Sequence, residues 1–289
     1  MLMKAVPFLL FVGAGAFVSS SELRDVRSES AAKIPVVTIH AKDFSFTAPA
    51  SIAAGQTTFR LVNDGKELHH ISIIKLAQGK TLADLQAALK NPGPPPAWMT
   101  SVGGPNAAVP GKSVEATLTL EAGNYVLLCF IPSPGETVPH MAKGMVKALT
   151  VEKSGVVQAG MSTATTVAPP VPTVHLVMKD YGFTFSKPLT AGKHVIHVMN
   201  EGPQDHEAIF IKLAPGKTVH DFGVWAETGM KGPPPAMPVD GMAGMGKGLT
   251  GIFPANLTPG KYALLCFVPD MKDGKSHAEH GMSTEFEVK

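Results

Sequence analysis

The sequence is poor in cysteine and in charge. Only two of its 289 residues are cysteines, Cys129 and Cys266, and charged residues make up 17% of the chain. A framework of several disulfides is therefore excluded. A single bond between the two thiols is the simplest alternative, but it is not expected, because the two cysteines lie at equivalent positions of an internal repeat, each in its own candidate ligand set. The low charge and the hydrophobic content of 44% together exclude a disordered chain.

Patterns that would indicate several other functions are also missing. The formal net charge is +2, and the Lys and Arg residues are spread along the chain without a basic stripe interleaved with aromatic residues. Nucleic acid is therefore not expected as a partner. No Ser–His–acid set or pair of catalytic carboxylates stands out.

An apolar run stands at the start of the chain. Lys4 precedes the run at 5–18, and Ser19 begins a group of small residues. The run is too short for a membrane span and is interrupted by Pro7 and two glycines. Residues 1–20 are therefore predicted to be a signal peptide, with a retained anchor as the alternative. We expect a periplasmic or extracellular protein with no membrane span after signal cleavage.

Short apolar runs separated by turn residues dominate the rest of the sequence. With 29 Gly and 25 Pro, such runs favour many short strands and an all-β Greek-key sandwich or barrel. Strands are predicted at Val36–Ile39, Thr57–Val62, His69–Ile74, Ser113–Leu120 and Tyr125–Phe130. One short helix per domain is expected, after Thr81 and near Thr218, the first stopped by Asn91 and Pro92.

The chain contains an internal repeat. Residues 34–153 align with 173–289, with an offset of 137 at each of the pairs that matter most, which predicts two tandem domains joined by a linker at 154–172. The aligned pairs are Asp43 with Asp180, Asn63 with Asn200, His69 with His206, Tyr125 with Tyr262, Cys129 with Cys266, His140 with His277 and Met145 with Met282. One loop between these pairs differs in length between the two copies, although the spacing of the pairs is the same. We therefore expect the structure to be fixed at the paired residues and variable in the loop.

The repeat also separates candidate ligands from other histidines. His70 aligns with Glu207, and His280 aligns with Lys143, so neither is preferred as a ligand. A further set of histidines has no counterpart histidine in the first repeat and is expected to be at the surface or structural: His175, His194, His197 and His220.

The residues around each cysteine carry the chemistry. Cys129 ends an apolar strand, and a Pro-rich loop leads from it to His140 and then to Met145. Thiolate, imidazole and thioether are soft ligands that suit copper far better than calcium or magnesium. Zinc is also bound by Cys and His, but a methionine thioether is not among its usual ligands. His69 shares a face with apolar residues, which leaves a core histidine bonded to backbone as its other explanation.

The pattern Asn63-Asp-Gly-Lys-Glu-Leu-His69, then Tyr125-x3-Cys129-Phe-x-Pro, then His140-x4-Met145 resembles the cupredoxin, or type 1 blue copper, family, twice over in this chain. The resemblance implies one type 1 copper per domain. It makes His69, Cys129 and His140 the equatorial ligands and Met145 the axial one, with His206, Cys266, His277 and Met282 in the second domain. Ten residues separate Cys129 from His140, a longer loop than in many small members of the family.

Multicopper oxidases and copper nitrite reductases link type 1 copper to a second copper centre through a histidine beside the ligand cysteine. Cys129 lies between Leu128 and Phe130, without such a histidine. We therefore predict that the protein is not an enzyme and serves outer-sphere electron transfer with a redox protein partner. The alternatives are a periplasmic copper carrier or buffer, favoured by the Met-rich stretch 230–245, and a metal-free cupredoxin-like binding module.

Overall fold

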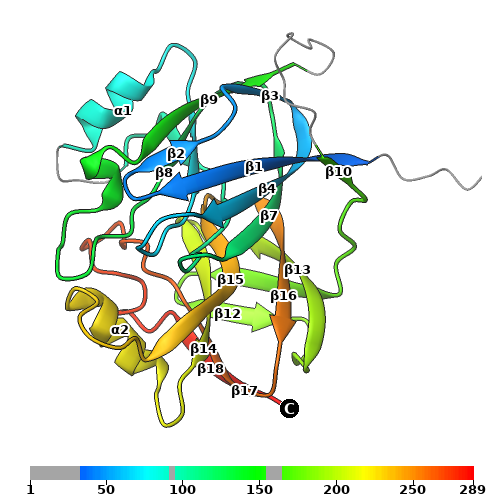
Figure 1. Ribbon diagram of the computed structural model, residues 1–289, viewed down its shortest axis with the longest axis vertical. Helices are drawn as coiled ribbons and strands as arrows, with labels where there is room; N and C mark the ends of the chain where they lie inside the picture. Colours follow the sequence, from blue (N-terminus) through cyan, green and yellow to red (C-terminus); the bar gives the residue numbers. More distant parts are fainter. Residues whose placement is uncertain (1–32, 91–94, 154–164) are drawn as a thin grey trace, which may run out of the picture. The chain divides into compact units, whose positions relative to one another are not determined.

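The computed structural model describes residues 33–90, 95–153 and 165–289, and its strands form three sheets (Figure 1). The largest has the order β10-β1-β4-β7-β16-β13-β11-β12, with β2 paired to β1. Its strands are β1 (Ile34–Lys42), β2 (Ser45–Thr47), β4 (Gly55–Asn63), β7 (Ser113–Leu120), β10 (Thr165–Val167), β11 (Val174–Lys179), β12 (Gly182–Phe185), β13 (Gly192–Asn200) and β16 (Thr250–Leu257).

Each repeat adds a smaller sheet of its own. The first repeat has the order β3-β9-β8-β5-β6, and the second has β15-β14-β17-β18. The strands are β3 (Ser51–Ala53), β5 (Ser72–Leu76), β6 (Met99–Ser101), β8 (Gly123–Leu128) and β9 (Val146–Glu152), then β14 (His206–Leu213), β15 (Ala236–Met245), β17 (Gly260–Leu265) and β18 (Ser283–Val288).

A hydrophobic core joins the large sheet to the two smaller ones. Phe59 of β4 and Leu127 of β8 are fully buried in it, as are Phe253 of β16 and Leu264 of β17 in the second repeat. Alternation along the strands places these side chains inward, as in β7, where Val114 and Ala116 are buried and Ser113 is exposed. The prediction of two tandem all-β sandwich domains is confirmed.

One short helix accompanies each repeat, as predicted. Helix α1 (Leu82–Ala88) begins after Thr81, whose hydroxyl accepts from the Asp84 backbone amide, while the Asp84 side chain accepts from the Thr81 amide. The second helix, α2 (Val219–Glu227), has the same capping box after Thr218. This reciprocal cap satisfies amides that the first helical turn leaves without partners. The predicted stop of the first helix, at 91–92, lies outside the described residues.

Strand boundaries shift at the two places that matter for the cysteine and histidine. The predicted strand His69–Ile74 begins only at Ser72, and the predicted strand Tyr125–Phe130 ends at Leu128. His69 and Cys129 therefore both lie just outside a strand end. Regular strand pairing does not include these two residues. The His69 backbone bonds to Ala108, and the Cys129 amide bonds to the Met145 carbonyl.

The two repeats are joined by backbone hydrogen bonds as well as by side chains. The edges of β7 and β16 pair at Thr117 and Ile252. The Gly103 amide donates to the Gly244 carbonyl at 3.0 Å. The Ala243 amide donates to the Gly104 carbonyl at 2.9 Å. The described residues of both repeats thus form one compact unit.

The predicted signal peptide, 1–20, lies outside the described residues, and so do residues 154–164 of the predicted linker. The remainder of that linker contains β10, which pairs with β1. The domain boundaries stay predictions. Within the described part of the chain, no helix is both long enough and apolar enough to cross a membrane.

Candidate metal centres

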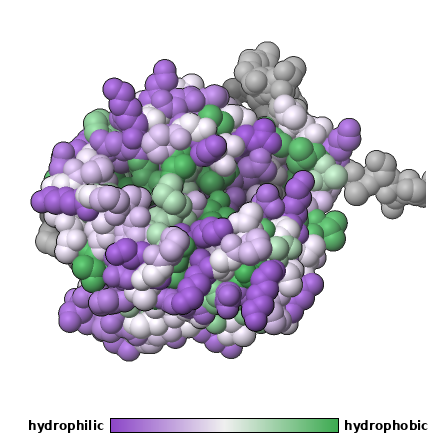
Figure 2. Space-filling view, turned by 60° about the horizontal axis from the view of Figure 1, so that its bottom comes forward, coloured by the Kyte–Doolittle hydropathy of each residue, from purple (hydrophilic) through white to green (hydrophobic). Residues whose placement is uncertain are grey.

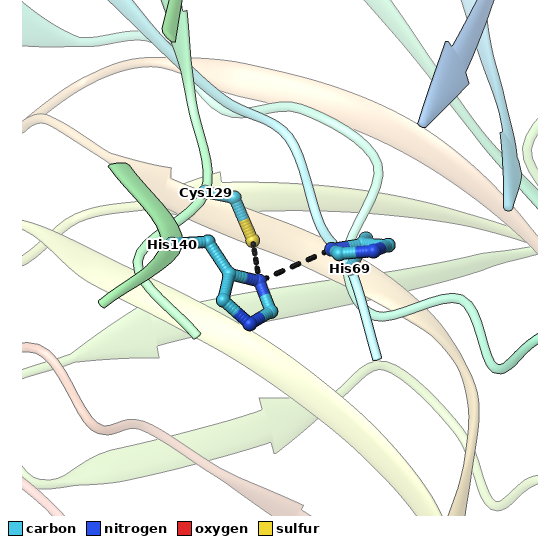
Figure 3. A group of neighbouring side chains, drawn as sticks. All are labelled: His69, Cys129 and His140. Carbon is cyan, nitrogen blue, oxygen red and sulfur yellow. Dashed lines mark hydrogen bonds between the residues drawn. The ribbon is translucent and has the colours of Figure 1, made fainter. Parts of the chain in front are cut away.

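Two groups of His, Cys and His come together, one in each repeat. In the first centre, ligand atoms of His69, Cys129 and His140 all lie within 4.8 Å of one another. The three side chains point toward a common point (Figure 3). All three are fully buried. The second centre consists of His206, Cys266 and His277, again within 4.8 Å and fully buried.

The long loop between Cys129 and His140 is closed at its base. The His140 amide donates to the Ile131 carbonyl at 2.9 Å, and the Met141 amide donates to the Cys129 carbonyl at 2.8 Å. The chain therefore leaves and returns at adjacent positions, and the loop length does not set the distance between the ligands. The loop of the second repeat is closed in the same way. The His277 amide donates to the Val268 carbonyl at 2.9 Å, and the Ala278 amide donates to the Cys266 carbonyl at 2.8 Å.

His69 is held by a loop on the opposite side of the centre. Its backbone forms an isolated β-bridge with Ala108. The His69 amide donates to the Ala108 carbonyl at 3.3 Å, and the Ala108 amide donates to the His69 carbonyl at 2.8 Å. The Asn63 side-chain amide donates to the carbonyl oxygens of Ala108 and Glu67, both at 2.8 Å. Asn63, part of the pattern that first suggested the family, thus fixes the segment that carries the histidine.

Both rings of the first centre present the same nitrogen to its interior. His69 Nδ1 lies 3.1 Å from His140 Nδ1, which in turn lies 3.5 Å from Cys129 Sγ. The outer nitrogens face carboxylates: His69 Nε2 is 3.0 Å from Asp43 Oδ1, and His140 Nε2 is 2.8 Å from Glu67 Oε2.

Because a carboxylate only accepts, each Nε2 of this centre carries its proton, and in a neutral ring Nδ1 is then a bare lone pair. Burial lowers the pKa of His140, which favours the neutral ring. Two lone pairs directed at each other beside a thiol make a site for a cation. Ligating histidines commonly donate their second N–H to a carboxylate in this way.

The thiols are protonated in the absence of a metal. Burial raises the pKa of Cys129 to about 12 and also raises the pKa of Cys266. Both cysteines are free, as their equivalent positions in the two repeats predict. A metal at either centre must displace the thiol proton to gain a thiolate ligand.

The second centre keeps the inner arrangement and changes the outer one. His206 Nδ1 lies 3.1 Å from His277 Nδ1, and Cys266 Sγ lies 3.5 Å from the latter. His206 Nε2 is 2.8 Å from Asp180 Oδ1. His277 Nε2 has no hydrogen-bond partner among the described residues and lies 3.6 Å from Asp270 Oδ2.

Met145 and Met282 are fully buried, and their backbones bond to those of the candidate ligands. The Met145 amide donates to the His140 carbonyl at 3.0 Å, and its carbonyl accepts from the Cys129 amide at 3.4 Å. The Met282 backbone makes the same two bonds with His277 and Cys266, at 2.8 and 3.3 Å. Their role as axial ligands stays a prediction.

The residues next to the candidate ligands lie outside the centres. His70 Nε2 accepts from the Phe130 amide at 3.1 Å, and Glu207 Oε1 accepts from the Phe267 amide at 2.9 Å. His280 is partly exposed and bonds to Asp273 at 3.1 Å. The histidines set aside from the repeat alignment are therefore not part of either centre.

Sequence reasoning did not assign a role to the carboxylates. Asp43 and Asp180 were aligned by the repeat, and Glu67 lies inside the quoted pattern. The available signal was an acidic residue at matching positions in both copies, Asp43 and Asp180. Glu67 gives no such signal, because Gln204 replaces it in the second repeat.

The donor sets fit copper. Each offers two imidazole nitrogens and one cysteine sulfur in a buried pocket, with a methionine beside them, and imidazole and soft sulfur ligands suit copper. The sandwich fold and these two ligand sets together define a protein of tandem cupredoxin-like domains with candidate copper centres.

Comparison with known proteins found no matching protein-family model and no matching curated protein. Solved structures do match. Reduced auracyanin from Roseiflexus castenholzii is 24% identical over 41% of this chain and 97% of its own, with a TM-score of 0.28. A multicopper oxidase is 14% identical over 88% of both chains, with a TM-score of 0.23. Copper nitrite reductase from Nitrosomonas europaea is 14% identical over 88% of this chain and 93% of its own, with a TM-score of 0.24.

These matches correct one prediction. The sequence predicts that the protein is not an enzyme, because no histidine adjoins Cys129 or Cys266. The solved structures that match 88% of the chain, a multicopper oxidase and a copper nitrite reductase, contradict that prediction. The prediction was drawn from neighbours along the chain, and these do not limit which side chains meet in space.

Proposed function

We propose that each centre holds one type 1 copper ion and that the protein exchanges electrons by outer-sphere transfer. In the first centre His69, Cys129 and His140 are the equatorial ligands and Met145 is the axial one. His206, Cys266, His277 and Met282 have the same roles in the second. When bound, copper supplies a one-electron couple.

The observation that carries this proposal is the pair of inward Nδ1 atoms beside each thiol. They lie 3.1 Å apart in both centres, with Cys Sγ 3.5 Å from one of them. Backbone bonds hold the loops that carry these residues, and the side chains are sealed from water. Ligands that hardly move on oxidation or reduction favour rapid electron exchange.

The rings do not reach the surface directly. His140 and His277 are fully buried, and each has an aromatic residue against it that is only half-buried. Phe44 meets His140 at a centroid distance of 5.2 Å, and Tyr181 meets His277 at 5.7 Å. Phe44 and Tyr181 occupy equivalent positions of the repeat. The electron route that we propose leaves each centre past this aromatic ring.

A redox protein is the proposed partner. Phe130 and Val138, in the loop between Cys129 and His140, are 39% and 46% exposed. On the face shown in Figure 2, apolar side chains lie in patches bounded by hydrophilic ones. Small apolar patches with a polar surround suit weak redox encounters. Export to the periplasm or beyond is also proposed, from the predicted signal peptide.

A copper carrier without redox duty has less support. Its sequence argument was the Met-rich stretch, but Met242 and Met245 are fully buried and pack in the core, and Met230 is also buried. Met242 lies against the first repeat, 3.4 Å from the Gly104 amide. Met242 and Met245 therefore act in core packing, and Met237, which is 48% exposed, is the one surface methionine of the stretch.

The test is copper loading of the purified chain. We expect two thiolate-bound copper ions, which give an intense visible thiolate-to-copper band that disappears on reduction and returns on oxidation. Cys129→Ser and Cys266→Ser should each remove one ion and part of the band. A colourless protein, or copper that is bound but not reversibly reduced, would overturn electron transfer. Assays of dioxygen and nitrite reduction by the loaded protein then identify what accepts the electrons.

A further inference from the structure

Two histidines outside the copper centres face each other on the large sheet. His175 lies on β11 and His197 on β13, and their Nδ1 atoms are 3.3 Å apart. The ring centroids are 5.3 Å apart and the rings are nearly perpendicular. The repeat alignment predicts that both are surface or structural residues, because neither has a counterpart histidine in the first repeat.

Strand pairing fixes this approach. β11 and β13 are parallel, and His175 is directly opposite His197 in their register. The residues on either side of them, Val174, Leu176, Ile196 and Val198, are fully buried. Alternation along the strands therefore places both imidazoles on the outer face of the sheet. His175 is exposed and His197 is partly exposed.

The spacing is that of a metal chelate. Metal–nitrogen bonds to imidazole are about 2.0–2.1 Å long. Two nitrogens 3.3 Å apart then subtend an angle of about 107° at a shared ion, which is wider than the angle of about 90° between neighbouring ligands of a tetragonal ion, so a small turn of the two rings completes the fit. The inward nitrogens of the two candidate copper centres are 3.1 Å apart, so the outer pair has nearly the same geometry without movement of the backbone.

We propose that His175 and His197 form a third metal site, which binds a divalent first-row transition ion, Cu(II) most tightly. Imidazole is a ligand for Cu, Zn and Ni, and the order of affinity among divalent ions peaks at Cu(II). The pair itself offers two imidazole nitrogens and no sulfur, so Cu(I) is not favoured. Solvent on the exposed side completes a tetragonal ligand set with water.

The environment favours the neutral form of the His197 ring, which is the form that binds a metal. Burial, and then the neighbouring His175, lower the pKa of His197. In the first repeat the equivalent cross-strand pair is Thr38 and Arg60, and Arg60 Nε donates to Glu115 at 2.6 Å. The site therefore belongs to the second repeat alone and does not depend on the proposed function of the buried centres.

The experiment is a Cu(II) titration of the full chain, followed by EPR. We expect a third equivalent of copper with a tetragonal nitrogen-ligand signal of large hyperfine splitting, distinct from thiolate-bound copper. His175→Ala and His197→Gln should each abolish this equivalent and leave the visible thiolate band unchanged. The matched control, His220→Ala, removes an exposed histidine on α2 and should retain it.

A gain of function uses the repeat itself. Thr38→His combined with Arg60→His places two histidines at the equivalent register position, and we expect one additional tetragonal Cu(II). The proposal is overturned if no third equivalent binds, or if the signal survives both His175→Ala and His197→Gln. A third signal without any thiolate band would leave this site standing and overturn the proposed function.

Discussion

Glu67 Oε2 lies 2.8 Å from His140 Nε2, so a carboxylate holds the second histidine of the first centre. In the second repeat Gln204 occupies this position, and its side chain bonds to Asp270 at 3.0 Å instead. His277 Nε2 is left 3.6 Å from Asp270. The two centres therefore share their inner geometry and differ in the contact behind one candidate ligand, a carboxylate at hydrogen-bond distance in the first and a carboxylate at 3.6 Å in the second.

Replacing the carboxylate tests this difference. In Glu67→Gln the amide oxygen can still accept from His140 Nε2, but the negative charge is gone. We expect copper affinity at the first centre to fall about 10- to 100-fold. The reduction potential should rise, because a nearby negative charge stabilises Cu(II) relative to Cu(I). Both are measured in a Cys266→Ser background, which isolates the first centre.

The control is Glu136→Gln, since Glu136 pairs with Lys143 and is half exposed. It removes one negative charge from the loop between Cys129 and His140 without removing a contact to His140. An equal shift of potential in both variants would show that general charge, and not the contact with His140 Nε2, sets the difference.

A methyl group at Gly65 should disturb the first histidine. A Cβ there would lie 2.4 Å from Asp43 Oδ1 and 2.8 Å from His69 Nε2. We expect Gly65→Ala to force the two groups apart, to lower stability by about 1–3 kcal/mol and to weaken copper binding about tenfold or more. Chemical denaturation and competition with a copper chelator measure the two effects.

Gly223 in α2 provides the comparison, because no atom lies within 4 Å of a Cβ built there. Gly223→Ala should leave copper binding unchanged and stabilise the helix by up to about 1 kcal/mol. If Gly65→Ala binds copper as tightly as this control, the contact between Asp43 and His69 does not orient the ligand.

Copper uptake should become tighter as pH rises. Burial raises the pKa of Cys129 to about 12, so its thiol is protonated throughout the neutral range. Binding as thiolate releases about one proton per thiol, which makes the affinity rise roughly tenfold per pH unit. Calorimetry in buffers of different ionisation enthalpy counts the protons. Uptake without proton release would mean that the thiol is not a ligand.

Glu207 should make the copper-free protein less stable at higher pH. Burial raises its pKa from 4.5 to about 7. The folded state binds the proton more tightly than the unfolded state, so the stabilisation is present below pH 4.5 and is lost as pH rises toward 7. The loss approaches about 3 kcal/mol.

Glu207→Gln keeps an oxygen that accepts from the Phe267 amide and removes the titration. We expect its unfolding free energy to exceed that of the parent increasingly between pH 5 and 7, as followed by urea denaturation at several pH values. A constant difference across this range would show that Glu207 is ionised in the folded protein at every pH tested.

The sequence by itself determined the repeat, the sandwich class and the grouping of ligand types. An offset of 137 between the copies marked His69, Cys129 and His140 with their partners, because side chains fixed by a shared geometry keep their spacing while loops change. The helices at Thr81 and Thr218 followed from local capping chemistry, which acts within one turn.

Only the tertiary structure decided which nitrogen of each histidine faces inward and which carboxylate stands behind it. Asp43 and His69 are 26 residues apart, and Glu67 and His140 are 73 apart, so their meeting depends on loop packing. The pairing of His175 with His197 depends on strand register. Register and side-chain direction arise from contacts between distant segments, and the spacing of residues along one chain does not specify them.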